Sequence, residues 1–285
     1  MSQPFYPLPE NPELRVLSLG AGVQSTTLAL MAAHGEFDAM PDCAIFADTG
    51  AEPKAVYEHL DWLSSGNVLP FPVYRVSAGS LKEELLSAGK GYGNSWGRPP
   101  LYVENTKTKR GVGRLRRQCT GDYKIDPIQK KVRELLGLRP RQRWPKEPTV
   151  EQWIGISLDE VHRVKQLAIK ALAGRWPLIE KEMSRWDCKQ WLQRHDYPVP
   201  PKSSCTFCPY HSDAAWRDMK LNDPESWAEA VEVDEAIRNG VAGVKAEAIY
   251  LHRSLTPLAE VDLSNATDRG QIDALAEECE GMCGV

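Results

Sequence analysis

The segment Ser18-Leu19-Gly20-Ala21-Gly22-Val23-Gln24-Ser25-Thr26 lies between a short apolar run, residues 14–19, and a helical pattern that continues to Met31. This order predicts a strand, a glycine-rich turn and a helix. Glycines let a backbone approach an anion closely, and the N–H groups and dipole at a helix start favour negative charge. The segment is therefore a candidate phosphate-binding loop. It has neither a Walker A ending nor a dinucleotide pattern, and a tight turn without a ligand is the alternative.

Strands and helices alternate along the first half of the chain, and the second strand ends at Asp48-Thr49-Gly50. Such alternation predicts parallel βαβ units in an α/β fold, with ligands at the carboxyl ends of the strands. The predicted strands are 14–19, 43–47, 72–76 and 151–156, and the predicted helices after the first are 53–63, 125–135 and 159–172.

Two regions are expected along the chain. Residues 1–175 form a nucleotide-binding domain, within which the irregular connection 89–113 is a flexible, basic substrate loop. Residues 176–285 form a smaller, mainly helical region that contains cysteines. Six cations with no acid among them crowd one short stretch and favour an anionic ligand there: Lys107, Lys109, Arg110, Arg114, Arg116 and Arg117.

The bulk composition is that of an ordinary globular protein. The 285 residues are 42% hydrophobic and 26% charged, with a formal net charge of −4, which by itself carries no nucleic-acid footprint. No apolar run approaches the roughly 20 residues that a membrane span needs, and the amino-terminal residues are Pro-rich and polar. We therefore expect a cytoplasmic protein without a membrane partner.

Four cysteines are candidate metal ligands. Cys205 and Cys208 form a C-x-x-C pair, whose spacing lets both thiolates reach one metal ion. Cys119 and Cys188 are the natural completing pair. Four thiolates fit either a structural zinc ion or a [4Fe–4S] cluster, because both prefer soft ligands. Cys43 lies inside a predicted strand and is expected to be a small buried hydrophobe.

Three further segments, read in order with the loop, give a family resemblance. They are Asp48-Thr49-Gly50-Ala51-Glu52, then Arg117-Gln118-Cys119-Thr120 with Lys124, then Gly155-Ile156-Ser157-Leu158-Asp159-Glu160 with Arg163. Together they resemble the phosphoadenosine-phosphosulfate (PAPS) reductase family of PP-loop proteins, within the adenine-nucleotide α-hydrolase-like fold. The resemblance implies a Rossmann-like (HUP) sheet of five parallel strands with helices on both faces, and an adenosine moiety at its carboxyl edge.

The resemblance also implies site residues. Phosphates would be held by the loop, with Asp48, Thr49 and Gly50 lining the nucleotide pocket, and a second group of residues would bind the anionic substrate. The loop departs from the family in having Gly20 in place of its first serine and Gln24 in place of its aspartate. Gln24 cannot supply the carboxylate associated with Mg²⁺ and pyrophosphate release. The implied phosphate ligands are Ser18, Gly20, Ala21, Gly22, Gln24, Ser25 and Thr26, and the implied anion-site residues are Arg116, Arg117, Lys124, Glu160 and Arg163.

Within this resemblance, an iron–sulfur cluster is favoured over zinc for the cysteines. The last residues, Glu278-Cys279-Glu280-Gly281 and Met282-Cys283-Gly284, resemble the mobile tail that carries the nucleophilic cysteine of sulfonucleotide reductases. Cys279 and Cys283 are therefore the predicted catalytic residues. A frayed end, or a fourth ligand to the cluster, are the alternatives for these two cysteines.

The predicted function is sulfur chemistry that depends on ATP or on an adenylyl sulfonucleotide (PAPS or APS). One branch is reduction of the sulfonucleotide, and the other is adenylation followed by thiolation of a nucleic acid or a metabolite. The expected partner is a thiol or sulfur donor such as thioredoxin or a cysteine desulfurase. Two other classes stay open: a nucleic-acid-binding protein with a structural Cys₄ zinc site, and a simple nucleotide pyrophosphohydrolase.

Overall fold

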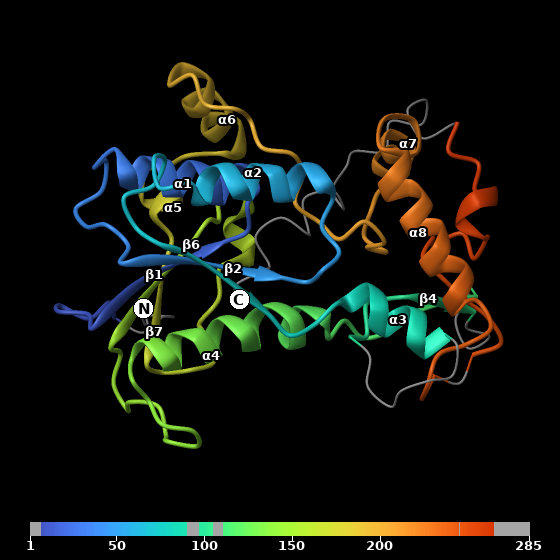
Figure 1. Cartoon of the computed structure of the whole chain (residues 1–285), viewed down its shortest axis with the longest axis horizontal. Coiled ribbons are helices and arrows are strands. Elements are labelled where there is room, and N and C mark those ends of the chain that lie inside the picture. Colours follow the sequence, from blue (N-terminus) through green and yellow to red (C-terminus); the bar gives the residue numbers. More distant parts are fainter. Residues whose placement is uncertain (1–6, 90–96, 105–110, 245, 265–285) are drawn as a thin grey trace.

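The computed structural model describes residues 7–89, 97–104, 111–244 and 246–264 (Figure 1). Within these ranges, no helix is both long and apolar enough to cross a membrane.

A parallel sheet of five strands forms the larger body of the molecule, in the order β3-β2-β1-β6-β7. Each strand pairs in parallel with its neighbours; for example, Leu17 of β1 is in register with Ala44 on one side and Trp153 on the other. The order reverses at β1, so the crevice between β1 and β6 is the switch point where ligands of such sheets bind. The strands are β1 (Leu14–Leu19), β2 (Cys43–Asp48), β3 (Val73–Ser77), β6 (Val150–Ile154) and β7 (Leu172–Arg175).

Helices cover both faces of this sheet, as predicted. Alternate strand residues point to opposite faces: Leu17 and Phe46 belong to one apolar core, and Val16 and Ile45 to the other. Figure 1 shows α1, α2, α5 and α6 on the first face and α4 on the second. Cys43 is buried in the second core, as predicted. The helix bounds are α1 (Val23–Ala33), α2 (Lys54–Ser64), α4 (Asp126–Leu135), α5 (Pro177–Glu180) and α6 (Arg185–Arg194).

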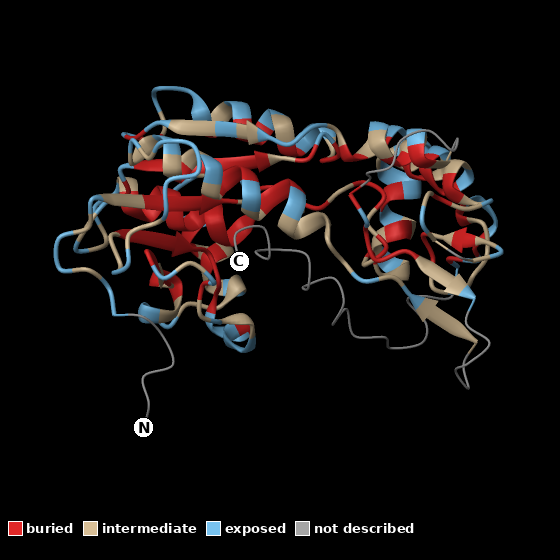
Figure 2. Cartoon of the chain, turned by 90° about the horizontal axis from the view of Figure 1, so that it is seen from below, coloured by how far each residue is buried: buried red, intermediate tan, exposed pale blue. Residues whose placement is uncertain are grey.

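A second body has its own apolar core, and Figure 2 shows buried residues gathered in both bodies. Its helices are α3 (Leu81–Gly89), α7 (Asp213–Asn222) and α8 (Pro224–Ile237). Gly89 packs so tightly on α8 that an added Cβ would lie 2.1 Å from the carbonyl oxygen of Ala236. A small antiparallel sheet completes this body in the order β5 (Val112–Arg114), β4 (Tyr102–Glu104) and β8 (Ile249–Tyr250).

The structure divides the chain differently from the predicted boundary at residue 175. Helix α6 packs on the five-stranded sheet, because its buried residues Trp191 and Leu192 complete the core beside α1. Helix α3 and the β4–β5 pair, which fall within the predicted first domain, join the second body instead. The predicted loop 89–113 therefore contains regular structure, since β4 and β5 pair in its described parts.

The helix predicted over 159–172 is wrong. A short 3₁₀ helix covers Leu158–Arg163, and Glu160 within it has non-helical angles, with φ −105° and ψ 16°. The chain then enters β7 at Leu172, which is buried beside β6. The apolar spacing between residues 161 and 172 suits a helix. A strand at the edge of the sheet is favoured instead, because it pairs with β6 and buries Leu172 and Ala173.

Candidate functional site

The turn between β1 and α1 presents a helix start with no side-chain cap. Gly22 occupies the N-cap position, so no side chain caps the helix. The first helical turn contains no acidic residue. Ala21 has φ 56°, a left-handed conformation that is strained for a residue with a Cβ. The first N–H groups of a helix have no partner within the helix, and together they attract an anion. This arrangement is suited to phosphate.

The hydroxyl groups of this loop stabilise its conformation through hydrogen bonds. Ser25 Oγ accepts a hydrogen bond from the Gly20 N–H at 3.1 Å, which closes the turn. Thr26 Oγ1 pairs with His59 Nε2 at 3.0 Å, and its N–H donates to the Gly22 carbonyl. Burial lowers the pKa of His59 to about 4, so the imidazole is neutral at physiological pH. The backbone N–H groups of the turn are therefore the donors that a phosphate would meet.

The carboxyl end of β6 closes against this loop. An added Cβ on Gly155 would lie only 3.0 Å from the Ser25 backbone, so only glycine allows the two chains to approach this closely. The amide of Gln24 donates to Ser157 Oγ at 3.4 Å. Ser18 Oγ, one strand away, accepts from Gln152 Nε2 at 2.8 Å. The loop is thus fixed from the β6 side by neutral groups.

The turn after β2 forms the other wall. Asp48 Oδ1 accepts hydrogen bonds from the Gly50 N–H at 2.8 Å and from the Tyr57 hydroxyl at 2.7 Å. Burial and the adjacent carboxylate raise the pKa of Tyr57, so this hydroxyl stays protonated and donates. Gly50 has φ 65°, which glycine adopts without strain. Asp48 therefore holds the turn in shape.

Glu52 joins three segments at a buried carboxylate. Its Oε1 lies 3.4 Å from Lys124 Nζ, and its Oε2 accepts from Ser203 Oγ at 3.1 Å. The side chains of Glu52 and Lys124 are 1% and 10% exposed. Ser203 borders the phosphate loop, because an added Cβ on Gly22 would lie 3.8 Å from its Cβ. Lys124 sits on the π-helical turn Gly121–Ile125, and its ion pair with Glu52 fixes the position of the ammonium.

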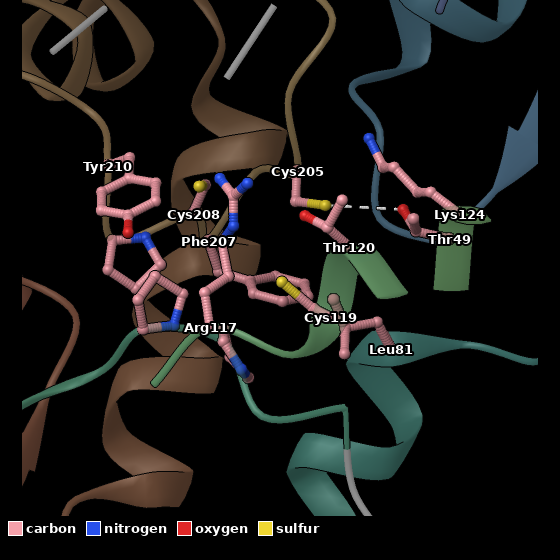
Figure 3. A pocket seen from close by; sticks show the side chains of 13 residues that line it. Thr49, Leu81, Arg117, Cys119, Thr120, Lys124, Cys205, Phe207, Cys208 and Tyr210 are labelled. Carbon is pink, nitrogen blue, oxygen red and sulfur yellow. Dashed lines mark hydrogen bonds between the residues drawn. The ribbon is translucent and has the colours of Figure 1, made fainter. Parts of the chain in front are cut away.

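A pocket lined by three cysteines lies beyond Lys124 (Figure 3). Thr49 Oγ1 and Cys205 Sγ lie within hydrogen-bond distance, 3.5 Å apart, which links the turn after β2 to the loop that carries Cys205 and Cys208. Burial lowers the pKa of His211 to about 4, so it is neutral, and its Nε2–H donates to the Cys205 carbonyl at 2.9 Å. The lining residues include Cys119, Cys205, Cys208, Arg117, Thr120 and Lys124, with apolar walls from Leu81, Pro99, Pro100, Phe207 and Pro209.

The structure does not bring Cys188 to this pocket. Cys188 lies on α6, fully buried in the core behind α1, and burial raises its pKa to about 12. Within the described ranges, no group of three or more Cys, His, Asp or Glu residues is arranged to hold a metal ion. The predicted four-cysteine centre is therefore not assembled by the described residues. The reason is that Cys188 lies on the apolar face of α6, which packs against α1.

Glu160 and Arg163 form a second buried ion pair at the carboxyl end of β6. Arg163 Nη1 donates to Glu160 Oε1 at 2.6 Å, and their side chains are 7% and 1% exposed. Burial raises the pKa of Glu160 to about 6, and the Arg163 charge opposes this shift without cancelling it. The Glu160 N–H bonds to the Ser157 carbonyl, which places the pair beside the residue that contacts Gln24.

Other predicted residues lie at the rim or outside the described part of the chain. Arg116 is exposed next to Arg117. The predicted catalytic residues Cys279 and Cys283 lie outside the described residues, as do Lys107, Lys109 and Arg110 of the basic stretch.

Sequence reasoning missed Ser203, Tyr210 and the role of Glu52. Glu52 belongs to the segment Asp48–Glu52, four residues after the end of β2. Its burial, which gives it a role, is visible only in the structure. Ser203 precedes the cysteine pair by two residues, and Tyr210 follows it by two. Their positions beside a recognised motif were the available signal.

No family model matches the chain, and no curated protein matches it with significance. Among solved structures, 25 chains match. One is a phosphoadenylyl-sulfate (PAPS) reductase from Candida auris in a phosphate complex. The similarity covers 65% of this chain and 74% of that one, with 13% sequence identity and a TM-score of 0.40. At this level of likeness, the roles of the site residues rest on the geometry of this chain.

We expect Glu160→Gln to change how stability depends on pH. The folded-state pKa of Glu160, about 6, lies above its ordinary value of 4.5, so the folded state binds the extra proton between these values. Stability therefore falls by about 2 kcal/mol as pH rises through this window, and the variant lacks this fall. Urea unfolding at pH 4.5 to 7 measures it. Glu134→Gln, which removes an exposed carboxylate on α4, is the control, and an unchanged slope in Glu160→Gln would contradict the assignment.

We expect Glu52 and Lys124 to be strongly coupled. Removing either partner leaves a buried charge, so Glu52→Gln and Lys124→Met should each destabilise the protein by roughly 3–5 kcal/mol. The double variant should lose clearly less than the sum of the two. Chemical unfolding of the four proteins gives the coupling energy. Additive losses would show that the pair does not interact.

Proposed function

We propose that the chain is an enzyme that binds the phosphates of an adenine nucleotide at the loop of residues 20–25 and performs sulfur chemistry at the adjacent cysteine pocket. One observation carries the proposal. The buried Glu52 carboxylate contacts both Ser203, which borders the loop, and Lys124, which lines the pocket. A nucleotide phosphate and a thiol would thus lie on either side of the Glu52–Lys124 ion pair. The motif resemblance to the PAPS reductase family supports the same combination.

Phosphate binding relies on backbone donors in this proposal. The loop contains no acidic side chain, and Gln24 is engaged with Ser157. A neutral helix start together with the Lys124 ammonium suits the oxygens of a phosphate or an adenylyl sulfate. We assign no Mg²⁺ ligand to the loop, because Gln24 replaces the carboxylate that would hold the ion.

Sulfur chemistry is proposed from the setting of the thiols. A thiolate is the reactive form of cysteine, and nearby cations stabilise it. Arg117 and Lys124 line the pocket together with Cys119, Cys205 and Cys208. The tail residues Cys279 and Cys283 remain proposed nucleophiles, and no step is assigned to a metal or cluster. The nucleotide is ATP, which would release pyrophosphate, or an adenylyl sulfonucleotide. In the second case a thiolate would attack the sulfur and displace the nucleotide, and a second thiol would then release sulfite and leave a disulfide.

The loop assignment predicts a graded effect of side chains at Gly22. An added Cβ meets only an ordinary contact with Ser203, so Gly22→Ala should keep nucleotide binding. Gly22→Leu would fill the space above the helix start and should abolish the thermal stabilisation given by ATP or adenosine 5′-phosphosulfate. Differential scanning fluorimetry checks this, with circular dichroism as the test of folding. A full ligand-induced shift in folded Gly22→Leu would rule out the loop as the phosphate site.

The thiol assignment predicts that Cys205→Ser loses turnover while keeping the nucleotide-induced shift. Its thiol lies in the pocket beside Thr49, whereas Cys188 is fully buried in the other body. Cys188→Ser is therefore the matched control, and it should lower stability while folded protein keeps its activity. The assays are sulfite release from adenosine 5′-phosphosulfate with dithiothreitol and pyrophosphate release from ATP. Full activity of Cys205→Ser would remove this thiol from the proposed reaction.

A further inference from the structure

A serine, a histidine and an aspartate form a line of hydrogen bonds beside β8. The hydroxyl oxygen of Ser254 lies 2.7 Å from Nδ1 of His252, and Nε2 of the same ring lies 3.1 Å from Oδ1 of Asp213. Asp213 belongs to α7 and is 39 residues away from His252 in the sequence. A nucleophile, a base and a group that orients the base are the parts of a catalytic triad, which is recognised by its geometry and not by the order of its residues.

The contacts of His252 decide which ring nitrogen carries the hydrogen. An ionised carboxylate only accepts hydrogen bonds, so Nε2, which faces Asp213, is the protonated nitrogen. Burial lowers the pKa of His252 below its ordinary value, and the Asp213 carboxylate opposes this shift without cancelling it. The imidazole is therefore neutral at physiological pH, and Nδ1 is an acceptor. It accepts from the Ser254 N–H at 3.2 Å, and the Ser254 hydroxyl donates to the same nitrogen.

Further contacts fix this line of side chains. Oδ2 of Asp213 accepts from Arg253 Nη2 at 2.7 Å, and Asp213 lies in the first turn of α7, where the helix dipole favours negative charge. The backbone on both sides of the histidine is fastened to Asp234 of α8. The two carboxylate oxygens of Asp234 accept from the N–H groups of Leu251 and Leu258, each at 2.8 Å. The geometry is thus set before a substrate arrives.

The base is shielded from water, whereas the hydroxyl is accessible. The side chains of His252 and Asp213 are 6% and 21% exposed, and Ser254 is an exposed residue. A molecule from solvent can therefore meet the hydroxyl while the base keeps its hydrogen bonds. Other residues line the cysteine pocket, so this is a separate site.

We propose that Ser254 is a nucleophile that accepts an acyl group from an activated ester, with His252 as its general base. Oγ of Ser254 attacks the carbonyl carbon, and its proton passes to His252 Nδ1. The bond between that carbon and the leaving oxygen breaks, and the leaving oxygen takes the proton. The products are an acyl-serine and an alcohol, with no oxidation or reduction. Asp213 is a positioning residue, because it touches the base and not the reacting atoms.

The experiment treats the full chain with p-nitrophenyl acetate and locates the acetyl groups by peptide mass spectrometry. Ser254 should be acetylated roughly 100-fold faster than Ser264, which is the usual contribution of a positioned general base. Ser264 is the matched control in the same segment, because it is exposed and its hydroxyl donates to Asp262 instead of to a histidine. His252→Gln should remove the difference between the two serines.

The pH profile separates a reactive site from a structural hydrogen bond. The acetylation rate of Ser254 should rise as His252 loses its proton and should level off above a midpoint that lies below pH 6.5. Asp213, Asp234 and Arg253 are the charged groups around the ring that set this midpoint. Asp213→Asn should lower the plateau roughly tenfold or more, because an amide that donates to Nε2 moves the ring hydrogen to Nδ1.

Equal acetylation rates of Ser254 and Ser264 in the unchanged chain would overturn the proposal. That comparison needs no variant, so it holds even if a substitution prevents folding. A rate at Ser254 that does not depend on pH, or that is unaffected by His252→Gln in protein shown to be folded by circular dichroism, would overturn it as well. The reaction needs neither the loop of residues 20–25 nor a thiol, so its outcome is independent of the proposed function.

Discussion

The carboxylate of Glu52 lies inside the molecule, where it accepts from the Lys124 ammonium and the Ser203 hydroxyl. A buried carboxylate is costly unless its oxygens are paired, so the turn after β2 is held against both partners. The neighbouring contacts repeat the same junction: the Thr206 N–H donates to the Ala51 carbonyl, and Thr49 contacts Cys205. The candidate phosphate loop, the turn after β2 and the loop that carries Cys205 and Cys208 therefore form one connected unit.

The position of this unit follows from the sheet. The strand order reverses at β1, and the chain leaves β1 and β6 in opposite directions, which opens a crevice at their carboxyl ends. Two local features lie at this edge of the sheet. Ala21 accepts a strained left-handed conformation, and Gly155 lets β6 approach the Ser25 backbone. Strain of this kind persists where the surrounding structure requires it, which is typical of functional sites.

The cysteine pocket depends on the way the two bodies share the chain. Cys119 and Arg117 follow β5, whereas Cys205, Cys208 and Tyr210 belong to a segment that is far away in the sequence. They meet because α3 and the β4–β5 pair leave the body that contains the five-stranded sheet and pack with α7 and α8. The same interleaving sends α6 back to the sheet and carries Cys188 with it. Three thiols are thereby brought to an arginine-rich rim, and the fourth becomes part of an apolar core.

Local sequence determined the parts of this protein whose physics is local. Apolar runs of strand length, the glycine-rich turn at 20–22 and the proline before α2 were enough to predict the parallel α/β sheet and the turn that joins β1 to α1. Spacing alone failed over 159–172, because the same apolar positions suit a helix or a strand until the neighbour β6 is known. Only the tertiary structure decided that Glu52 is buried between Lys124 and Ser203 and that Cys188 lies apart from the cysteines of the pocket. It also decided that two arginines lie over the ring of Tyr210. Burial, ion pairing and cation–π contacts join residues distant in the chain, and a residue's own neighbours in the sequence carry no information about such partners.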